Sequence, residues 1–393
     1  MAELGCVEVS SRAAGRVRDG HPWIFRSDVR RADSAGAGDV VRVVARHRGG
    51  GLNGLGLALF SPVSMIALRM LGRDEAPPGA GFWEARLDAA LELRRRLGGE
   101  DSAGRLVYSE ADGLPGLIVD RYADVLVLQT LTAGAERLKG VVVDWLVARL
   151  APRAVVERND SSARSFEGLE ERVGLLRGAL DGPVEILEGG LRISVDPLGG
   201  QKTGHYLDQR ENRVRAAAYA RGRCLDVFSY QGGFGLQLAR GGAAEVTLVD
   251  QSERALAAAQ ADAGRNGLEV RCRTANAFDF LRDQHAAGER YDLVVLDPPA
   301  FAKNRQAVEG ATRGYKEINL RAMKLLAPGG VLITASCSFH MLEERFEALL
   351  AEAARDVGRG VQLLERRGAA RDHPERLGFP EGRYLKCFVL RVA

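Results

Sequence analysis

The sequence has little cysteine, and the cysteines it has form no disulfide or metal-binding pattern. Five occur in 393 residues, and no two of them are arranged as a C-x-x-C pair. An odd number without such pairs argues against a disulfide framework and against a zinc site. We therefore expect a metal-independent protein of a reducing compartment, the cytoplasm.

The sequence also lacks long apolar runs. No stretch approaches the roughly 18 consecutive apolar residues that a transmembrane helix needs. The start, Met1 to Ser11, contains acidic residues and no apolar core like that of a signal peptide. We expect neither secretion nor membrane insertion. With 46% hydrophobic and 27% charged residues the composition is that of a soluble globular protein, and 393 residues are enough for two or three domains.

The net charge of +3 is small, but the positive charge is concentrated near the N-terminus. Charge alone leaves two interpretations equally open, a solvated arginine-rich face and a nucleic-acid contact. The arginines that we consider for RNA contact are Arg12, Arg16, Arg26, Arg30 and Arg31.

Prolines and glycines between residues 73 and 81 mark a boundary between two kinds of pattern. Before it, short β-like runs separated by glycine-rich turns predict a small β-barrel over residues 1–72. After it, the order helix, two strands, helix, strand predicts a central α/β domain over residues 82–189, a possible second RNA contact. Residues 190–393 alternate strands and helices, which indicates a parallel sheet covered on both faces, as in a Rossmann-like fold.

The first strand of this alternation runs into a glycine turn, Leu225 to Gly235. Glycines at 232, 233 and 235 would let a ligand approach the backbone closely. The spacing differs from the dinucleotide pattern G-x-G-x-x-G, and Asp226 at the strand end would suit a cationic sulfonium or amino group better than a pyrophosphate. These features favour an adenosine cofactor with a positive charge.

The following strands supply further polar residues where they end. Asp250 ends the second strand, at the place where an acid binds both hydroxyls of a ribose. Asn276 follows the third strand, where it would bond the adenine edge, and Ala277 would add a backbone or apolar contact. The fourth strand ends in Asp297-Pro298-Pro299, whose prolines restrict the backbone beside the acid. Read alone, this triplet is also compatible with a simple strand stop.

A fifth strand delivers Ser336-Cys337-Ser338 to the same edge of the sheet. The polar setting of Cys337 at a strand end distinguishes it from the other cysteines. We assign those to the core as small apolar residues: Cys6, Cys224, Cys272 and Cys387.

Long strings along nearly the whole chain resemble the large-subunit ribosomal RNA cytosine-5 methyltransferases that carry a PUA domain. The strings are His21 to Phe25, Glu110 to Gly116, Gln201 to Arg213, Asp297 to Pro299, Arg313 to Lys316, Ser336 to Ser338, Asp372 to Pro374 and Pro380 to Lys386. The resemblance implies an N-terminal PUA-like barrel, a central α+β domain and a Rossmann-like class I methyltransferase domain. It also implies S-adenosylmethionine as methyl donor and large-subunit ribosomal RNA as partner, with the basic N-terminal module binding RNA.

In this family reading Cys337 is the nucleophile and Asp297 bonds the target base. Carbon 5 of cytosine is too weak a nucleophile for a methyl sulfonium until a thiolate has added to carbon 6. The cofactor residues that we predict are Asp226, Phe228, Tyr230, Gly232, Gly233, Asp250, Gln251, Asn276, Ala277, Asp297, Pro298, Tyr206 and Asp208. At Asn276 the sequence departs from the family, in which an acid is common.

Several alternatives stay open at this point. Tyr206 and Asp208 would either cover the cofactor or grip a flipped base. The base that removes the carbon 5 proton is His340 or a water molecule. A guanine methyltransferase without a cysteine nucleophile and a non-catalytic RNA-binding assembly factor are the competing functions. The sequence does not decide whether the chain forms a homodimer.

Overall fold

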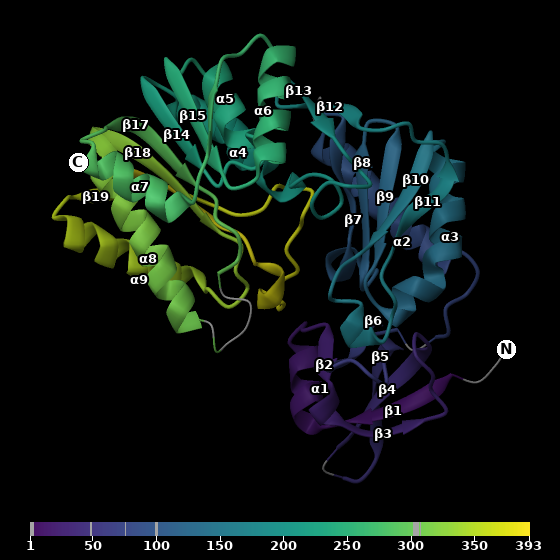
Figure 1. The fold of residues 1–393 in the computed structure, drawn as a ribbon. Helices are drawn as coiled ribbons and strands as arrows, with labels where there is room; N and C mark the ends of the chain where they lie inside the picture. Colours follow the sequence, from purple (N-terminus) through teal and green to yellow (C-terminus); the bar gives the residue numbers. More distant parts are fainter. Residues whose placement is uncertain (1–3, 48, 75, 99–100, 302–305, 307) are drawn as a thin grey trace. The chain divides into compact units, whose positions relative to one another are not determined.

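A computed structural model of the chain describes residues 4–47, 49–74, 76–98, 101–301, 306 and 308–393. Glu75, in the predicted linker, lies outside the described residues. The chain forms two compact units (Figure 1). The first comprises Met1–Ile186, Val195–Leu207 and Arg371–Gly382, and the second comprises Leu187–Ser194, Asp208–Ala370 and Arg383–Ala393.

The N-terminal part of the first unit is a curled six-stranded sheet with one short helix, built from short strands of the kind that the sequence predicted. The strand order is β2-β6-β5-β4-β1-β3. Alternating apolar residues such as Val41, Val43 and Leu68 fill its core. The elements are β1 Gly5–Val9, α1 Ser11–Arg18, β2 Trp23–Phe25, β3 Val29–Asp33, β4 Val40–Arg46, β5 Leu52–Phe60 and β6 Ile66–Gly72.

The rest of the first unit is a five-stranded sheet, in the order β11-β10-β9-β8-β7, against which two helices pack. The two helices of the predicted order are α2 and α3, and β7 and β11 are strands that this order did not include. The elements are α2 Phe82–Leu97, β7 Ala103–Tyr108, β8 Leu117–Tyr122, β9 Val125–Thr130, α3 Ala133–Leu150, β10 Ala154–Asn159 and β11 Arg172–Gly178. The hairpin β12 Val184–Glu188 and β13 Leu191–Val195 follows.

The second unit contains a seven-stranded sheet in the order β16-β15-β14-β17-β18-β20-β19. The first five strands of this order are parallel, and β20 is antiparallel to both β18 and β19. The strands are β14 Arg223–Val227, β15 Glu245–Asp250, β16 Arg271–Thr274, β17 Tyr291–Leu296, β18 Leu326–Ser336, β19 Val361–Arg367 and β20 Lys386–Val392. The two late strands extend the sheet at its edge.

Helices cover both faces of this sheet (Figure 1). One layer is formed by α4 Arg210–Ala216, α5 Gly233–Arg240 and α6 Glu253–Arg265. The other is formed by α7 Ala277–Ala286, α8 Val308–Leu325 and α9 Glu343–Val357, which share a core with β14, β17 and β18. The predicted Rossmann-like alternation of strands and helices is confirmed. Across the described part of the chain, no helix has both the length and the apolar character required to cross a bilayer.

The division into three domains stays a prediction. Two segments of the predicted third domain, Val195–Leu207 and Arg371–Gly382, pack within the first unit. The second is held there by polar contacts: the backbone oxygen of Asp372 accepts from Arg94 at 2.9 Å, and its carboxylate accepts from the Arg105 backbone at 2.9 Å. Such contacts link residues more than 260 positions apart and leave no local signal in the sequence.

Candidate active site

The predicted site residues of the second unit lie where four neighbouring strands end. Asp250 is the last residue of β15, and Asp226 is the penultimate residue of β14. Asp297 directly follows β17, and Cys337 directly follows β18. Since these strands are parallel and adjacent, their carboxyl ends share one edge of the sheet, which we call the carboxyl edge. This is the edge at which ligands bind in open α/β sheets.

Asp226 is a buried acid with one unsatisfied oxygen. Its side chain is 1% exposed, and Oδ2 accepts a 2.8 Å hydrogen bond from the Gly235 backbone. Oδ1 is buried without a hydrogen-bond partner. Burial, assisted by the charges of Asp297 and Asp250, raises the pKa of Asp226 to about 8. A cationic or N–H-bearing ligand group at Oδ1 would satisfy this oxygen and restore the ionised form.

The turn after β14 is strained and is held by Asp250. Phe228 and Tyr230 have φ angles of 64° and 49°, the left-handed region that residues other than glycine rarely adopt. The Tyr230 backbone donates to Asp250 Oδ2 at 2.8 Å, and the Ser252 backbone donates to Oδ1 at 2.9 Å. Such strain persists where surrounding contacts enforce it, commonly at functional turns.

The glycines of the turn are required by packing inside the protein. A Cβ at Gly235 would lie 2.0 Å from Leu248 Cδ2, and one at Gly233 would lie 2.5 Å from Arg213 Cδ. At Gly232, where φ is 73°, a Cβ would lie 2.9 Å from the same leucine. The turn thereby brings α5 close against β15.

The residues after β15 and β16 include a helix cap. Asn276 accepts hydrogen bonds through Oδ1 from the backbones of Phe278, at 2.9 Å, and Asp279, at 3.3 Å, and so caps α7. Ala277 is buried, and Gln251 is exposed beside the end of β15. The predicted contacts of these residues with adenine and ribose stay predictions.

Asp297 is oriented by a residue that the sequence reading did not single out. Its Oδ1 accepts a 2.9 Å hydrogen bond from Gln209 Nε2. Gln209 in turn accepts from Asn212 at 2.7 Å, and Asn212 accepts from Arg367 at 2.8 Å. Gln209 belongs to the string Gln201 to Arg213, which supported only the family resemblance. Its role follows from the hydrogen bond to Asp297, a contact between residues distant in the sequence.

Cys337 lies beside the Asp297-Pro298 segment, as expected from the order of the strands. Its thiol donates to the Pro298 carbonyl at 3.9 Å, and the side chain is partly exposed. Cys224 and Cys387 are buried, which raises the pKa of their thiols to about 11 and about 12. Cys6 and Cys272, expected in the core, are only half-buried.

A second residue missed from the sequence is Lys386, the first residue of β20. It pairs with Ser336 across the antiparallel ladder, so its side chain lies next to the cysteine loop. The ammonium is 2% exposed and donates to the backbone oxygens of Ser338 and Tyr384, both at 2.8 Å. Burial lowers the pKa of Lys386 to about 8, against opposing effects of Cys337 and, to a smaller extent, Glu343. The described residues place no carboxylate within ion-pair distance of this lysine.

Tyr206 and Asp208 belong to different units. Tyr206, in the first unit, bonds Gln201, and the Lys202 ammonium lies 4.4 Å from the centre of its ring. Asp208, in the second, is buried and accepts from Tyr384 at 2.6 Å. Their roles at the cofactor stay predictions.

Four of the five N-terminal arginines form hydrogen bonds or ion pairs within their own unit. Arg12 and Arg16 both bind buried Asp28, at 3.0 and 2.7 Å. Arg26 donates to the Ser64 carbonyl at 2.8 Å. Arg31 pairs with Asp33 on the surface at 2.7 Å, and Arg30 is exposed. RNA binding by these five arginines stays a prediction.

Comparisons with known proteins agree with this geometry. A family model described as S-adenosylmethionine-dependent methyltransferase matches residues 172–380, and a PUA-like domain model matches residues 7–73. The chain is 44% identical over 382 residues to ribosomal RNA large subunit methyltransferase I of Shewanella frigidimarina, with 95% of both chains covered. It is 40% identical over 386 residues to the Vibrio cholerae protein of that name, with 96% of both covered.

Among solved structures, the methyltransferase SMU.776 in complex with SAH matches with a TM-score of 0.85 at 20% identity. The match covers 99% of this chain and 100% of that one. At this identity the likeness shows the fold. Together with the two family models it confirms the predicted combination of a PUA-like domain and a Rossmann-like methyltransferase domain.

Proposed function

Because the chain belongs to the family of S-adenosylmethionine-dependent methyltransferases that includes ribosomal RNA large subunit methyltransferase I, we propose that it methylates carbon 5 of a cytosine in large-subunit ribosomal RNA. The observation that carries the proposal is the thiol of Cys337 at the carboxyl edge, 3.9 Å from the carbonyl of Pro298 and therefore beside Asp297. In the order of the strands, the predicted cofactor residues Asp226, Asp250 and Asn276 belong to the ends of β14, β15 and β16, on the side of β17 opposite to Cys337.

The residues present fit the cofactor. When bound, S-adenosylmethionine supplies an electrophilic methyl group on a positively charged sulfur. The buried, unpartnered Oδ1 of Asp226 is suited to an amino group or to this positive charge. Asp250 already fixes the turn and lies at the strand end where an acid binds ribose hydroxyls.

The electrostatics around Cys337 suit a nucleophile. Lys386 is a buried cation bonded to two carbonyl oxygens and to no carboxylate among the described residues. A buried charge needs a counter-charge. A thiolate at Cys337 supplies it, so we assign Lys386 the role of favouring the reactive, ionised form of the cysteine.

The reaction then proceeds with its atoms and charges balanced. The thiolate of Cys337 forms a bond to carbon 6, and the ring electrons shift toward nitrogen 3 and the carbonyl. Asp297, whose Oδ1 is held by Gln209, in its protonated form donates to nitrogen 3, neutralises the charge that develops there, and accepts from the amino group. Carbon 5 would take the methyl group as the bond of that group to the cofactor sulfur breaks, which leaves the neutral thioether product. A base then removes the carbon 5 proton, the bond between carbon 6 and Cys337 breaks to return the thiolate, and nitrogen 3 returns its proton to Asp297. His340 or water is that base.

The target base must leave its stack to reach Cys337. We assign RNA binding to the PUA-like module, where exposed Arg30 is the one of the five predicted arginines whose side chain has no hydrogen bond or ion pair with any described residue. Arg12 and Arg31 keep side-chain exposures of 71% and 72% beside their acidic partners, so both remain accessible to phosphate.

Cys337→Ala tests the mechanism. We expect complete loss of cytosine methylation, measured by bisulfite sequencing of ribosomal RNA, with S-adenosylmethionine binding retained. Cys272→Ala, a half-buried cysteine on β16, is the matched control and should retain activity. RNA containing 5-fluorocytosine should trap a covalent adduct with the wild type but not with Cys337→Ala, because fluorine cannot leave as a proton.

Retained methylation by Cys337→Ala would overturn the cysteine mechanism and favour attack by a purine nitrogen, as in guanine methylation. Absence of S-adenosylmethionine binding to the wild type in calorimetry would overturn catalysis itself and leave an RNA-binding assembly factor.

A further inference from the structure

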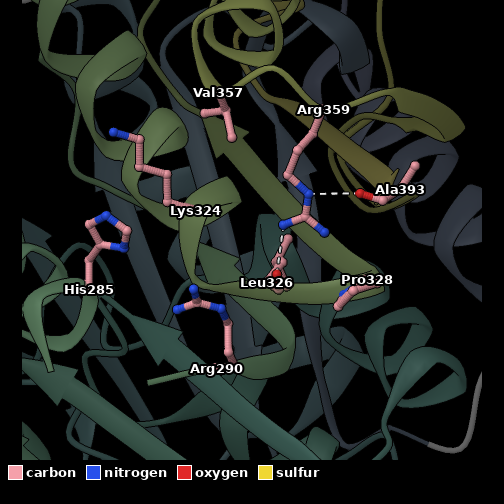
Figure 2. A pocket seen from close by; sticks show the side chains of 8 residues that line it. All are labelled: His285, Arg290, Lys324, Leu326, Pro328, Val357, Arg359 and Ala393. Atoms are coloured by element: carbon pink, nitrogen blue, oxygen red, sulfur yellow. Dashed lines mark hydrogen bonds between the residues drawn. The ribbon is translucent and has the colours of Figure 1, made fainter. Parts of the chain in front are cut away.

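A pocket of about 340 Å³ lies at the opposite, amino edge of the methyltransferase sheet (Figure 2). Its lining includes Arg290, which precedes β17, and Leu326, which begins β18. Strand β17 has six residues, so this amino edge is about 20 Å from the carboxyl edge at roughly 3.3 Å per residue. The pocket is therefore separate from the site described above.

The lining is strongly cationic. His285, Arg290, Lys324 and Arg359 surround the pocket, and no Asp or Glu side chain is among its lining residues (Figure 2). Burial, followed by the charge of Arg290, lowers the pKa of Arg359, so the two guanidinium groups act on each other. A carboxylate at Ala393 would offset one of these charges and still leave an excess of positive charge in the lining. Like charges held together repel, and an anion between them would relieve the repulsion.

The cations fall into two kinds. Arg359 has a structural role, because its guanidinium donates to the backbone oxygens of Met323, Leu326, Ala327, Val392 and Ala393. Lys324 makes no side-chain hydrogen bond or ion pair with any residue that the structure describes. Arg290 donates to the Glu289 carbonyl at 2.8 Å and has no ion pair within the described part of the chain.

Helix C-termini attract cations, which offers a purely structural explanation. Helices α7, α8 and α9 all end at this pocket. The carbonyls at the end of α8, however, are already bound by Arg359 at 2.8 and 2.6 Å. Arg290 and Lys324 are thus additional positive charge that the helix ends do not require.

We propose that this pocket is a second RNA contact, which binds phosphate groups of the substrate's backbone through Arg290 and Lys324. Exposed Pro328 and half-buried Val357 provide an apolar surface beside the cations, suited to the ribose between two phosphates. The volume is within the range of about 300–1,000 Å³ that small ligand groups occupy. Phosphate contacts fix the position of a nucleic acid without reading its sequence. The inference rests on the proposed function for the RNA substrate, but not for the cysteine chemistry.

The test is the double variant Arg290→Gln/Lys324→Gln. Its control is Lys316→Gln/Arg282→Gln, which removes the same charge from α8 and α7 at side chains already paired with acids. Binding of a large-subunit ribosomal RNA transcript is measured over a series of salt concentrations. We expect roughly tenfold weaker binding by the test variant, with the slope of log affinity against log salt reduced by about 1 to 2, since each phosphate contributes about 0.7–0.9. The control should match the wild type.

Unchanged affinity and salt slope in the test variant would overturn the proposal. A second measurement separates direct contact from an indirect effect: the transcript should slow acetylation of Lys324, read by mass spectrometry, and leave Lys316 unaffected. Equal acetylation of Lys324 with and without RNA would also overturn it. Neither measurement requires methylation, so both would give the expected results even if the cysteine mechanism were wrong. Conversely, if the double variant still forms the 5-fluorocytosine adduct at saturating RNA, the cysteine mechanism is supported whatever the result for the RNA contact.

Discussion

The two edges of the methyltransferase sheet carry opposite charge. At the carboxyl edge three acids, Asp226, Asp250 and Asp297, follow neighbouring strands, and burial raises the pKa of Asp226 to about 8. At the amino edge Arg290, Lys324 and Arg359 gather without an acidic side chain in the lining. The difference in charge suits each edge to a ligand of the opposite sign, which agrees with the cationic donor proposed at one and the anionic chain proposed at the other.

Each edge also contains one ion that serves the structure around it. At the amino edge Arg359 holds backbone carbonyls together. At the carboxyl edge Lys386 holds the cysteine loop and brings a positive charge into an otherwise acidic region. Substitutions at each edge should distinguish the residues that stabilise the fold from those that bind a ligand or assist catalysis.

The largest effect is expected for Asp226→Asn. The amide can still accept from Gly235 but loses the negative charge, so cofactor affinity should fall roughly 100-fold, the value of a hydrogen bond to a charged group of about 1.5–3 kcal/mol. In the wild type the carboxyl is neutral below a pKa of about 8. Affinity should therefore rise between pH 6 and 8, and the variant should lack this dependence in calorimetry.

The same substitution should stabilise the protein. Because the pKa is raised in the folded state, the folded form holds a proton that the unfolded form has lost. The free energy of unfolding of the wild type should fall as the pH rises from about 4 to about 8. At pH 8 the variant should be more stable by roughly 1–3 kcal/mol in thermal or urea unfolding. Equal stability at pH 8 would contradict the burial of an unpaired charge.

At the amino edge, Arg359→Met should lower the free energy of unfolding by about 2 kcal/mol, since it leaves backbone carbonyls without donors. Arg290→Met should change it by less than about 0.5 kcal/mol, as for an ordinary surface substitution. Urea unfolding of the two variants measures the contrast. If both variants lose a similar amount of unfolding free energy, Arg290 has a structural role like that of Arg359, and the two arginines do not differ as we propose.

A smaller effect than the loss of cofactor affinity is expected for Lys386→Met, measured as the rate at which iodoacetamide alkylates Cys337. Without the cation the rate of alkylation at pH 7 should fall about tenfold, because about tenfold less of the cysteine is present as the reactive thiolate. The difference should disappear at pH 9.5, where the Lys386 ammonium, with a pKa of about 8, has lost its charge in the wild type. A merely structural role would change the rate equally at both pH values. Lys316→Met, on the surface of α8, is the control.

Much of the fold followed from local patterns. Helices α2 and α3 were predicted from apolar spacing, and the alternation after residue 190 predicted a parallel sheet, whose carboxyl ends must meet at one edge. Because the carboxyl ends of parallel strands meet at one edge, the sequence alone predicted that Asp226, Asp297 and Cys337 lie close together. The general preference of cysteine for the core assigned Cys6 and Cys272 there, yet both are half-buried, because burial depends on what covers a strand as well as on the residue type.

The sequence by itself therefore determined the order of the elements, the position of the acids and the cysteine at strand ends, and the family. Only the tertiary structure decided which residues surround them. Lys386 lies beside the cysteine loop because β20 runs antiparallel to β18 and begins where β18 ends. Gln209 reaches Asp297 across 88 positions, and the cationic pocket gathers residues from the ends of three helices. Contacts of this range depend on how the chain folds back on itself, and no periodicity or local motif encodes them.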